Sequence, residues 1–284
     1  MRGEREAGPA AARWRTLVRA RLAEVQRLAP RQGSAAGPAY WDSRARRFAA
    51  RLPVAAAVDD PLLRRLRRCT GGRTTVLDVG AGPGRFALNL APRVAEVIAV
   101  DPSPAMLRDL RRQARDLEVV NVHCVVGRWE EVDVPVADVA FSSFVLPLVE
   151  DAGTFLRKLD AAARRQALLY LSAFTNDALL DPLWRHFHGR PRRPAPTYLD
   201  AVAVLVELGL SPTVAVVQIR NRVRYATMAD AVADYCSHLL LPSSRQVRSE
   251  LGGLLASWLM ADGDGFVPPL PSVPAAIISW TPKG

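Results

Sequence analysis

The sequence predicts an α/β fold built on a mostly parallel sheet, and two observations lead to this prediction. Short apolar runs of strand length alternate with amphipathic stretches of helical length, at 75–79, 97–100, 119–126, 137–141 and 167–174 for the strands. The first run breaks into three glycines, Gly80, Gly82 and Gly84, before a helix-forming stretch resumes at 86–90. A strand, a tight loop and a helix start in this order are typical of the first unit of such a sheet.

The loop after the first strand suits a ligand that lies against the main chain, because a side chain would hold the ligand away. A dinucleotide loop needs a third glycine at position 85, which is Arg85. A nucleotide-hydrolase loop needs Lys and then Ser or Thr after Gly84, and neither follows. Asp78, near the strand end, would repel a phosphate. The loop therefore favours a cationic ligand.

The second strand ends in another acid, Asp101, which lies 23 residues after Asp78. An acid at the tip of the second strand of an α/β unit is placed to accept hydrogen bonds from a ribose diol. A nucleoside that carries a positive charge and no phosphate describes S-adenosylmethionine.

These residues resemble a known family. Asp78-Val-Gly80-Ala-Gly82-Pro-Gly84, followed by Val100-Asp101-Pro-Ser103-Pro-Ala-Met106-Leu107, is similar to the first two motifs of class I S-adenosylmethionine-dependent methyltransferases of the type 11/12 kind. The resemblance implies a Rossmann-like, seven-stranded, mostly parallel sheet in the order 3-2-1-4-5-7-6. It also implies S-adenosylmethionine as cofactor and S-adenosylhomocysteine as product.

The resemblance assigns the cofactor site residue by residue. The loop and strand ends contribute Asp78, Gly80, Ala81, Gly82, Gly84, Asp101 and Ser142, and the adenine is expected against Pro102 and Met106. After the third strand the family commonly has an acid or a hydroxyl, but here the position is Arg128. This departure leaves adenine recognition to the backbone, to stacking on Trp129, or to Glu130.

The acceptor is expected at the carboxyl end of the fourth strand, where open α/β sheets bind substrates. Ser142, Ser143 and Phe144 lie there, and Tyr40 and Trp41 belong to a helix that resembles the lid preceding the core in this family. In that helix we expect Asp42 or Ser43 as N-cap. No general base is evident; His186, His188 and Ser143 are candidates. The two histidines are two residues apart and lack a third ligand, so we expect no metal site.

The net charge of +10 lies entirely in residues 1–70, which hold 16 Arg and 6 acids, whereas the remainder holds 22 basic and 22 acidic residues. Such a segment can attract nucleic acid. However, Arg is used almost to the exclusion of Lys throughout the chain, in a bacterial-like composition, so a compositional bias also explains the positive charge. We therefore favour the interpretation that these arginines lie on solvated helix faces. Without an apolar run of membrane length or a visible signal segment, we expect a cytoplasmic protein.

We divide the chain into a basic helical extension or cap at 1–60 and a methyltransferase core at 61–284. The last two strands are predicted at 212–219 and 274–279, with a helical insertion at 220–272 between them. We interpret this insertion as a lid over the substrate. The alternative is that it forms a dimer surface, and we therefore expect either a monomer or a homodimer.

The predicted function is methyl transfer to an oxygen, nitrogen or carbon atom of a small molecule. Base-directed methyltransferases carry Asp/Asn/Ser-Pro-Pro-aromatic, or a nucleophilic Cys beside Pro, after the fourth strand, and residues 142–147 contain neither. Two alternatives stay open. One is an RNA methyltransferase that uses the basic N-terminal segment, although a nucleic-acid partner is not favoured; the other is a non-catalytic binding or assembly module of the same fold.

Overall fold

The seven strands of the main sheet follow the order β3-β2-β1-β4-β5-β9-β6. The structure is a computed structural model, and it describes residues 8–29, 37–42, 45, 54–173, 176–242 and 244–283. The predicted order is confirmed, with β9 as the seventh strand. The strands are β1 (Thr75–Val79), β2 (Glu96–Asp101), β3 (Val122–Val126), β4 (Ala137–Ser143), β5 (Ala163–Ser172), β6 (Thr213–Arg220) and β9 (Ser272–Trp280). All pairs are parallel except those that β9 forms with β5 and β6.

The register brings the ends of three strands to one edge. Val79 of β1 is aligned with Val100 of β2 on one side and with Ser142 of β4 on the other. Because parallel strands have their carboxyl ends at the same edge, the glycine loop, Asp101 and the end of β4 are neighbours.

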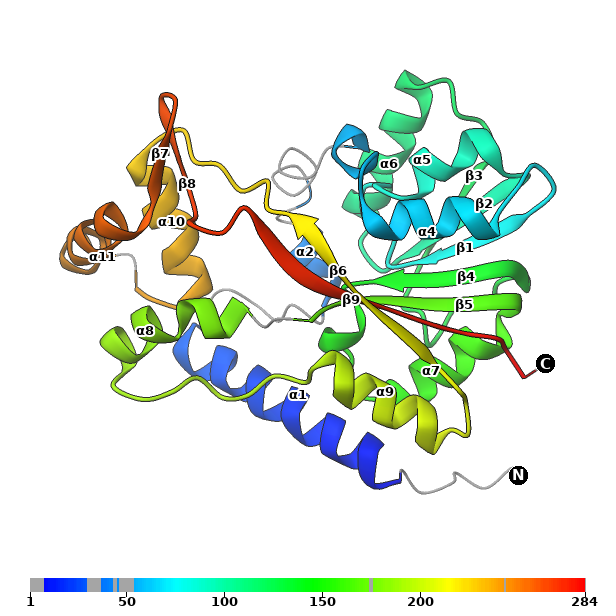
Figure 1. The fold of residues 1–284 in the computed structure, drawn as a ribbon, viewed down its shortest axis with the longest axis horizontal. Helices are drawn as coiled ribbons and strands as arrows, with labels where there is room; N and C mark the ends of the chain where they lie inside the picture. Colours follow the sequence, from blue (N-terminus) through cyan, green and yellow to red (C-terminus); the bar gives the residue numbers. More distant parts are fainter. Residues whose placement is uncertain are drawn as a thin grey trace.

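Helices cover both faces of the sheet (Figure 1). One face carries α4 (Pro61–Cys69), α5 (Ala87–Leu90) and α6 (Pro104–Asp116), and the other carries α7 (Ala152–Ala161) and α9 (Tyr198–Glu207). The central strands are buried on both faces and are therefore continuously apolar, as in β1, where only Thr75 is partly exposed. This explains why their apolar runs could be found in the sequence.

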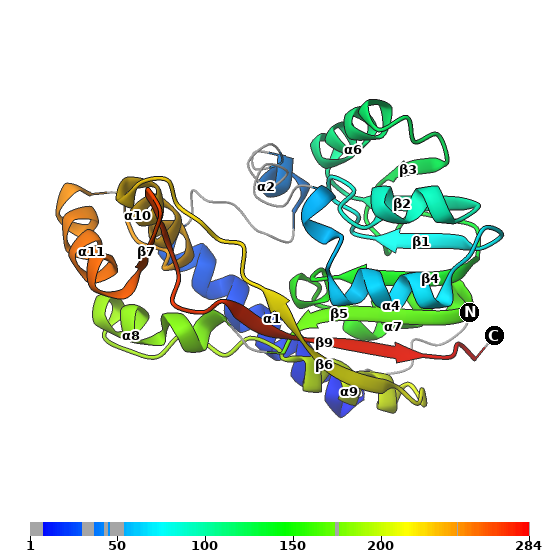
Figure 2. The same cartoon turned by 45° about the horizontal axis from the view of Figure 1, so that its top comes forward.

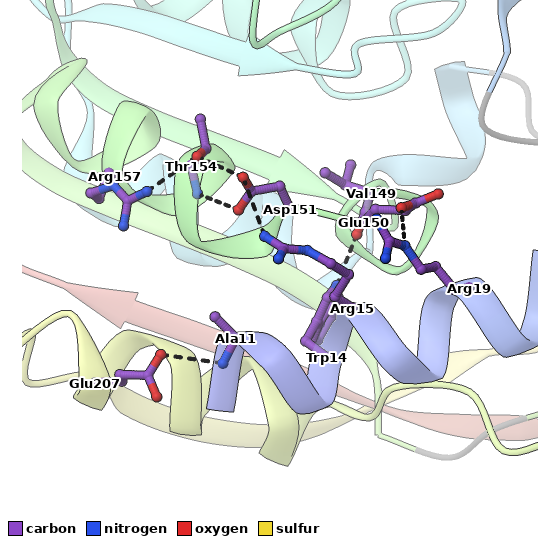
Figure 3. Close-up of polar contacts among 10 residues, drawn as sticks. All are labelled: Ala11, Trp14, Arg15, Arg19, Val149, Glu150, Asp151, Thr154, Arg157 and Glu207. Carbon is purple, nitrogen blue, oxygen red and sulfur yellow. Dashed lines mark hydrogen bonds and ion pairs between the residues drawn. The ribbon is translucent and has the colours of Figure 1, made fainter. Parts of the chain in front are cut away.

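The first helix, α1 (Pro9–Leu28), lies across α7 and α9 (Figure 1). Trp14 is fully buried, and its indole N–H donates to the Val149 carbonyl at 2.8 Å. Figure 3 shows that Arg15 and Arg19 point to Asp151 and Glu150, with ion-pair distances of 3.7 and 2.8 Å. The helix is thus a packed part of the molecule.

The insertion between β6 and β9 forms a second hydrophobic core at one side of the sheet. It contains α10 (Met228–His238), α11 (Arg245–Trp258) and a two-stranded hairpin of β7 (Met260–Asp262) and β8 (Gly265–Val267), and it packs with α8 (Asn176–His188) and the end of α1. Sequence reasoning predicted a helical insertion here but missed the hairpin, because its strands are only three residues long. Figure 2 shows these elements on the side to which β1, β4 and β5 point.

The expected N-cap at Asp42 is wrong. The helix α2 (Pro38–Asp42) begins earlier, so Asp42 is its last residue. The Asp42 carboxylate instead accepts hydrogen bonds from Ser103 Oγ at 2.6 Å and from the Ala105 N–H at 3.0 Å, at the start of α6. Ser43, the other predicted cap, lies outside the described residues. Among the described helices, none combines the length and apolar character that a bilayer crossing requires.

Candidate functional site

The three glycines of the loop after β1 each have a positive φ, of 80° at Gly80, 54° at Gly82 and 91° at Gly84. The loop is fixed to the neighbouring strand, because the N–H groups of Gly80 and Ala81 both donate to the Val100 carbonyl. A Cβ at Gly82 would meet nothing within 4 Å, whereas Cβ atoms at Gly80 and Gly84 would strike protein side chains. The main chain at Gly82 therefore faces open space that a ligand can occupy.

Asp101 closes the other side of this space. Its carboxylate accepts hydrogen bonds from the N–H groups of Gly82 and Ser103, each at 2.9 Å, and only 7% of the residue is exposed. Burial raises the pKa of Asp101, while these two N–H donors act in the opposite direction. Since each carboxylate oxygen can accept a second hydrogen bond, the side chain retains capacity for ligand hydroxyls.

Asp78 lies beneath the loop and is 1% exposed. Neither of its carboxylate oxygens has a hydrogen-bond partner among the described residues. Burial, and then the nearby negative charge of Asp101, raise the pKa of Asp78 well above its usual value; the Ala87 N–H acts against them without reaching hydrogen-bond geometry. A buried carboxylate without a partner is costly, and a cation or a donor from a ligand would relieve that cost.

The end of β4 carries two further unusual residues. Ser142 is 1% exposed, and its hydroxyl has no partner in the described part of the chain. Phe144 has a φ of 58°, which is rare for a residue with a side chain, and the residue is 37% exposed. Strained residues are concentrated at ligand-binding sites, so this position supports the prediction that Ser142, Ser143 and Phe144 form the acceptor side.

Sequence reasoning missed a buried polar cluster beside Phe144. The Phe144 ring lies 4.9 Å from that of Tyr170 on β5, and Asp60 accepts a hydrogen bond from Arg85 at 2.6 Å. Burial and the neighbouring Asp60 carboxylate raise the pKa of Tyr170. Asp60 also caps α4 by accepting from the Leu62 N–H. The cluster ties the glycine loop to α4. No pattern in the sequence links residues this far apart.

The predicted adenine side is only partly available to a ligand. Pro102 is half-buried, Met106 is 3% exposed, and Arg128 pairs with Glu131 at 3.3 Å. Trp129 is 4% exposed, and its indole donates to the Phe155 carbonyl at 3.2 Å. The prediction that the Trp129 ring stacks on the adenine is therefore wrong, because the ring belongs to the core on the α7 side.

The proposed lid residues belong to α2, next to the start of α6. Tyr40 and Trp41 are partly buried, with their rings 5.1 Å apart in an edge-to-face arrangement. The hydrogen bonds of Asp42 to Ser103 and Ala105 place this helix close to the segment that follows Asp101. Their role over the cofactor stays a prediction.

The two histidines among the three candidate general bases are not brought to this site. His186 bonds to Glu250 at 2.7 Å, and His188 bonds to the Leu239 carbonyl at 2.8 Å and stacks on Trp184. All of these partners belong to α8 and to the insertion and its loops, so the histidines stabilise the second core. The described residues contain no group of three metal-ligating side chains.

Comparisons with known proteins agree with this geometry. Residues 76–166 match the family described as Methyltransferase domain. An uncharacterized protein of Haemophilus influenzae is 31% identical over 61% of this chain and 64% of its own, and a malonyl-[acyl-carrier protein] O-methyltransferase of Halorhodospira halophila is 32% identical over 49% and 48%. The chain thus spans about half to just under two thirds of these relatives.

Among solved structures, magnesium protoporphyrin IX methyltransferase from Synechocystis PCC 6803 with bound SAH has the same fold, with a TM-score of 0.56. The two are 14% identical over 86% of this chain and 96% of that one.

Residues 76–166 therefore belong to the Methyltransferase domain family, and the chain has the fold of a solved methyltransferase with bound SAH. The family uses S-adenosylmethionine as its methyl donor, and the motif-bearing segment from β1 to β5 is the part that matches the family.

Proposed function

We propose that the protein transfers the methyl group of S-adenosylmethionine to an oxygen, nitrogen or carbon atom of a small-molecule acceptor bound at the carboxyl ends of β4 and β5. The observation that carries this proposal is the carboxylate of Asp78. It is buried, has no partner among the described residues and lies beneath a bare glycine loop. A site of this kind suits a small cation.

The residues present fit the cofactor that the family uses. Asp78 would neutralise the positive amino group, the open main chain at Gly82 would lie against the ligand, and Asp101 would accept the ribose hydroxyls. Pro102 and the backbone at 127–129 would border the adenine, since the Gly127 N–H donates to the Asp101 carbonyl and holds that turn next to β2. When bound, S-adenosylmethionine supplies a methyl group that its positive sulfur activates.

The protein's own task is then to position the acceptor and exclude water. Phe144 has a positive φ, its ring contacts that of Tyr170, and the residue is exposed. It therefore offers an apolar surface next to the loop. The half-buried Ser143 adds a hydroxyl at the same strand end. We assign the insertion 220–272, together with α8, to the role of a lid over this edge.

The RNA alternative requires free cations on the N-terminal segment. On α1, the ion pairs Arg13–Asp200, Arg15–Asp151 and Arg19–Glu150 join three arginines to acids of the same molecule. These pairs neutralise part of the positive charge, which favours a small-molecule acceptor over an RNA backbone.

The test is transfer of a labelled methyl group. Wild-type protein, incubated with methyl-labelled S-adenosylmethionine below saturation and a cell extract, should label a small molecule, and Asp101→Ala should label it more slowly. Asp116→Ala, at an exposed position on α6, is the matched control and should label like wild type. Label in RNA that is lost at high salt would support the RNA alternative. Cofactor binding without transfer of label to any acceptor would support the non-catalytic module.

A further inference from the structure

Two stretches of chain connect the main sheet with the insertion, and they run side by side (Figure 1). The first leaves β6 after Arg220, and the second returns to β9. Backbone hydrogen bonds join them, from the Asn221 N–H to the Pro271 carbonyl at 2.8 Å and, in both directions, between Tyr225 and Phe266 at 2.9 Å. A cavity of about 350 Å³ lies in this joint, and we call it the joint cavity.

The wall of the joint cavity is mainly apolar and stiff. Its apolar residues are Val223, Met260, Val267, Pro268, Pro269, Leu270 and Pro271. The prolines have fixed φ angles. The Asn221 side chain links the two stretches by donating to the Leu270 carbonyl at 3.0 Å, and it accepts from the Val223 N–H of its own stretch at 3.1 Å. The volume of this open, mainly apolar pocket falls within the range of small-molecule sites.

Two charged side chains border the joint cavity, and they differ in their partners. Asp262 bonds to Arg224, which also pairs with Asp264 at 3.1 Å, so one guanidinium compensates part of the negative charge of two acids. Arg220 is exposed to solvent, and its side chain has no hydrogen bond or ion pair within the described ranges. A guanidinium without an acid partner in the described part of the chain, beside an apolar wall, favours a ligand with an anionic group and an apolar chain.

The joint cavity is separate from the cofactor groove. Because β9 is antiparallel to both β5 and β6, β6 is parallel to β5, and its carboxyl end lies at the same edge of the sheet. The cavity is therefore at the acceptor edge, two strands or about 10 Å beyond β5. The glycine loop lies four strands from β6.

We propose that the joint cavity binds an aliphatic carboxylate, with the carboxylate on the Arg220 guanidinium and the chain against Val223, Leu270 and the prolines. The ligand would contact both the sheet and the insertion, and so would hold the insertion in place at the acceptor edge. This proposal concerns binding alone and does not depend on methyl transfer.

Calorimetric titration with decanoate and with decanol tests the proposal, because the two probes share a chain and differ in charge. Wild-type protein should bind decanoate about tenfold more tightly than decanol, and Arg220→Ala should remove that difference. Val223→Trp, which fills the cavity, should abolish binding of both. Arg115→Ala, an exposed arginine of α6, is the matched control and should bind like wild type.

Equal affinity of the wild-type protein for both probes, or no binding of either, would overturn the proposal. So would unchanged decanoate binding by Arg220→Ala. If Val223→Trp fails to fold by circular dichroism, Leu270→Trp replaces it, and the Arg220 comparison stands independently. All variants should bind S-adenosylmethionine like wild type, so a failure of this proposal is distinguishable from a failure of the proposed methyl transfer.

Discussion

Gly80 and Val145 are packed so closely that a Cβ on Gly80 would lie 2.1 Å from Val145 Cγ2. Gly80 belongs to the cofactor loop, and Val145 follows Phe144 at the end of β4. The contact therefore holds the cofactor side and the acceptor side of the site against each other. It also explains why this position requires glycine for space as well as for its positive φ of 80°.

Gly80→Ala should therefore disturb both sides of the site. The clash and the strained backbone together should lower the free energy of unfolding by about 1 to 3 kcal/mol and weaken S-adenosylmethionine binding. Thermal denaturation and calorimetric titration measure the two effects. Gly71→Ala is the control, since a Cβ there meets nothing within 4 Å. A Gly80→Ala protein with wild-type stability and affinity would contradict the packing argument.

Asp101→Ala should weaken S-adenosylmethionine binding by about 1.5 to 3 kcal/mol, the range for hydrogen bonds to a charged group. Because Asp101 also accepts from the Gly82 and Ser103 N–H groups, a small loss of stability should accompany this effect. Calorimetry gives the affinity, and Asp116→Ala serves again as control. An unchanged affinity would refute the assignment of Asp101 to the ribose.

Asp78 should make both stability and cofactor binding depend on pH. Its pKa is raised in the folded protein, so between the ordinary carboxyl pKa and the raised value the folded state binds the proton and the unfolded state does not. The contribution of Asp78 to stability is thus lost as the pH rises through this window. Affinity for the cationic cofactor should increase over the same window, because only the ionised carboxylate neutralises it.

Asp78→Asn, which cannot ionise, should flatten both dependences and bind the cofactor more weakly at neutral pH. Denaturation and calorimetry at a series of pH values test this. If Asp78→Asn and wild type show identical slopes, Asp78 is not the group responsible.

Arg85→Ala should destabilise the protein by about 3 to 5 kcal/mol, because it leaves the buried carboxylate of Asp60 without its ionic partner. Arg185→Ala removes a comparable pair with Asp181 on the surface, where both side chains are at least 35% exposed, and should cost less than about 1 kcal/mol. Urea denaturation compares the two. Equal losses would show that burial does not set the strength of the Asp60–Arg85 pair.

The sequence predicted the fold and the site where the residues that form them lie close together along the chain. The run from Asp78 to Gly84 and the acid at Asp101 predicted two strands, their order and the ligand type, because strand, loop and helix start follow one another directly. The Asp60–Arg85 pair and the tilted ring contact between Phe144 and Tyr170 join residues separated by 25 positions or more, so no local pattern reveals them. Trp129 shows that a local pattern can also mislead. Its position after the third strand suggested a contact with the ligand, but tertiary packing places its ring in the core, where the indole N–H donates to the Phe155 carbonyl.

The most direct test of the central claim is a calorimetric titration of the protein with S-adenosylmethionine, alongside Gly82→Val. A valine side chain at Gly82 would project into the open space in which the cofactor is expected. The account predicts saturable binding of one molecule per chain by the wild-type protein and none by folded Gly82→Val. Absence of binding by the wild-type protein, or equal binding by both, would contradict it.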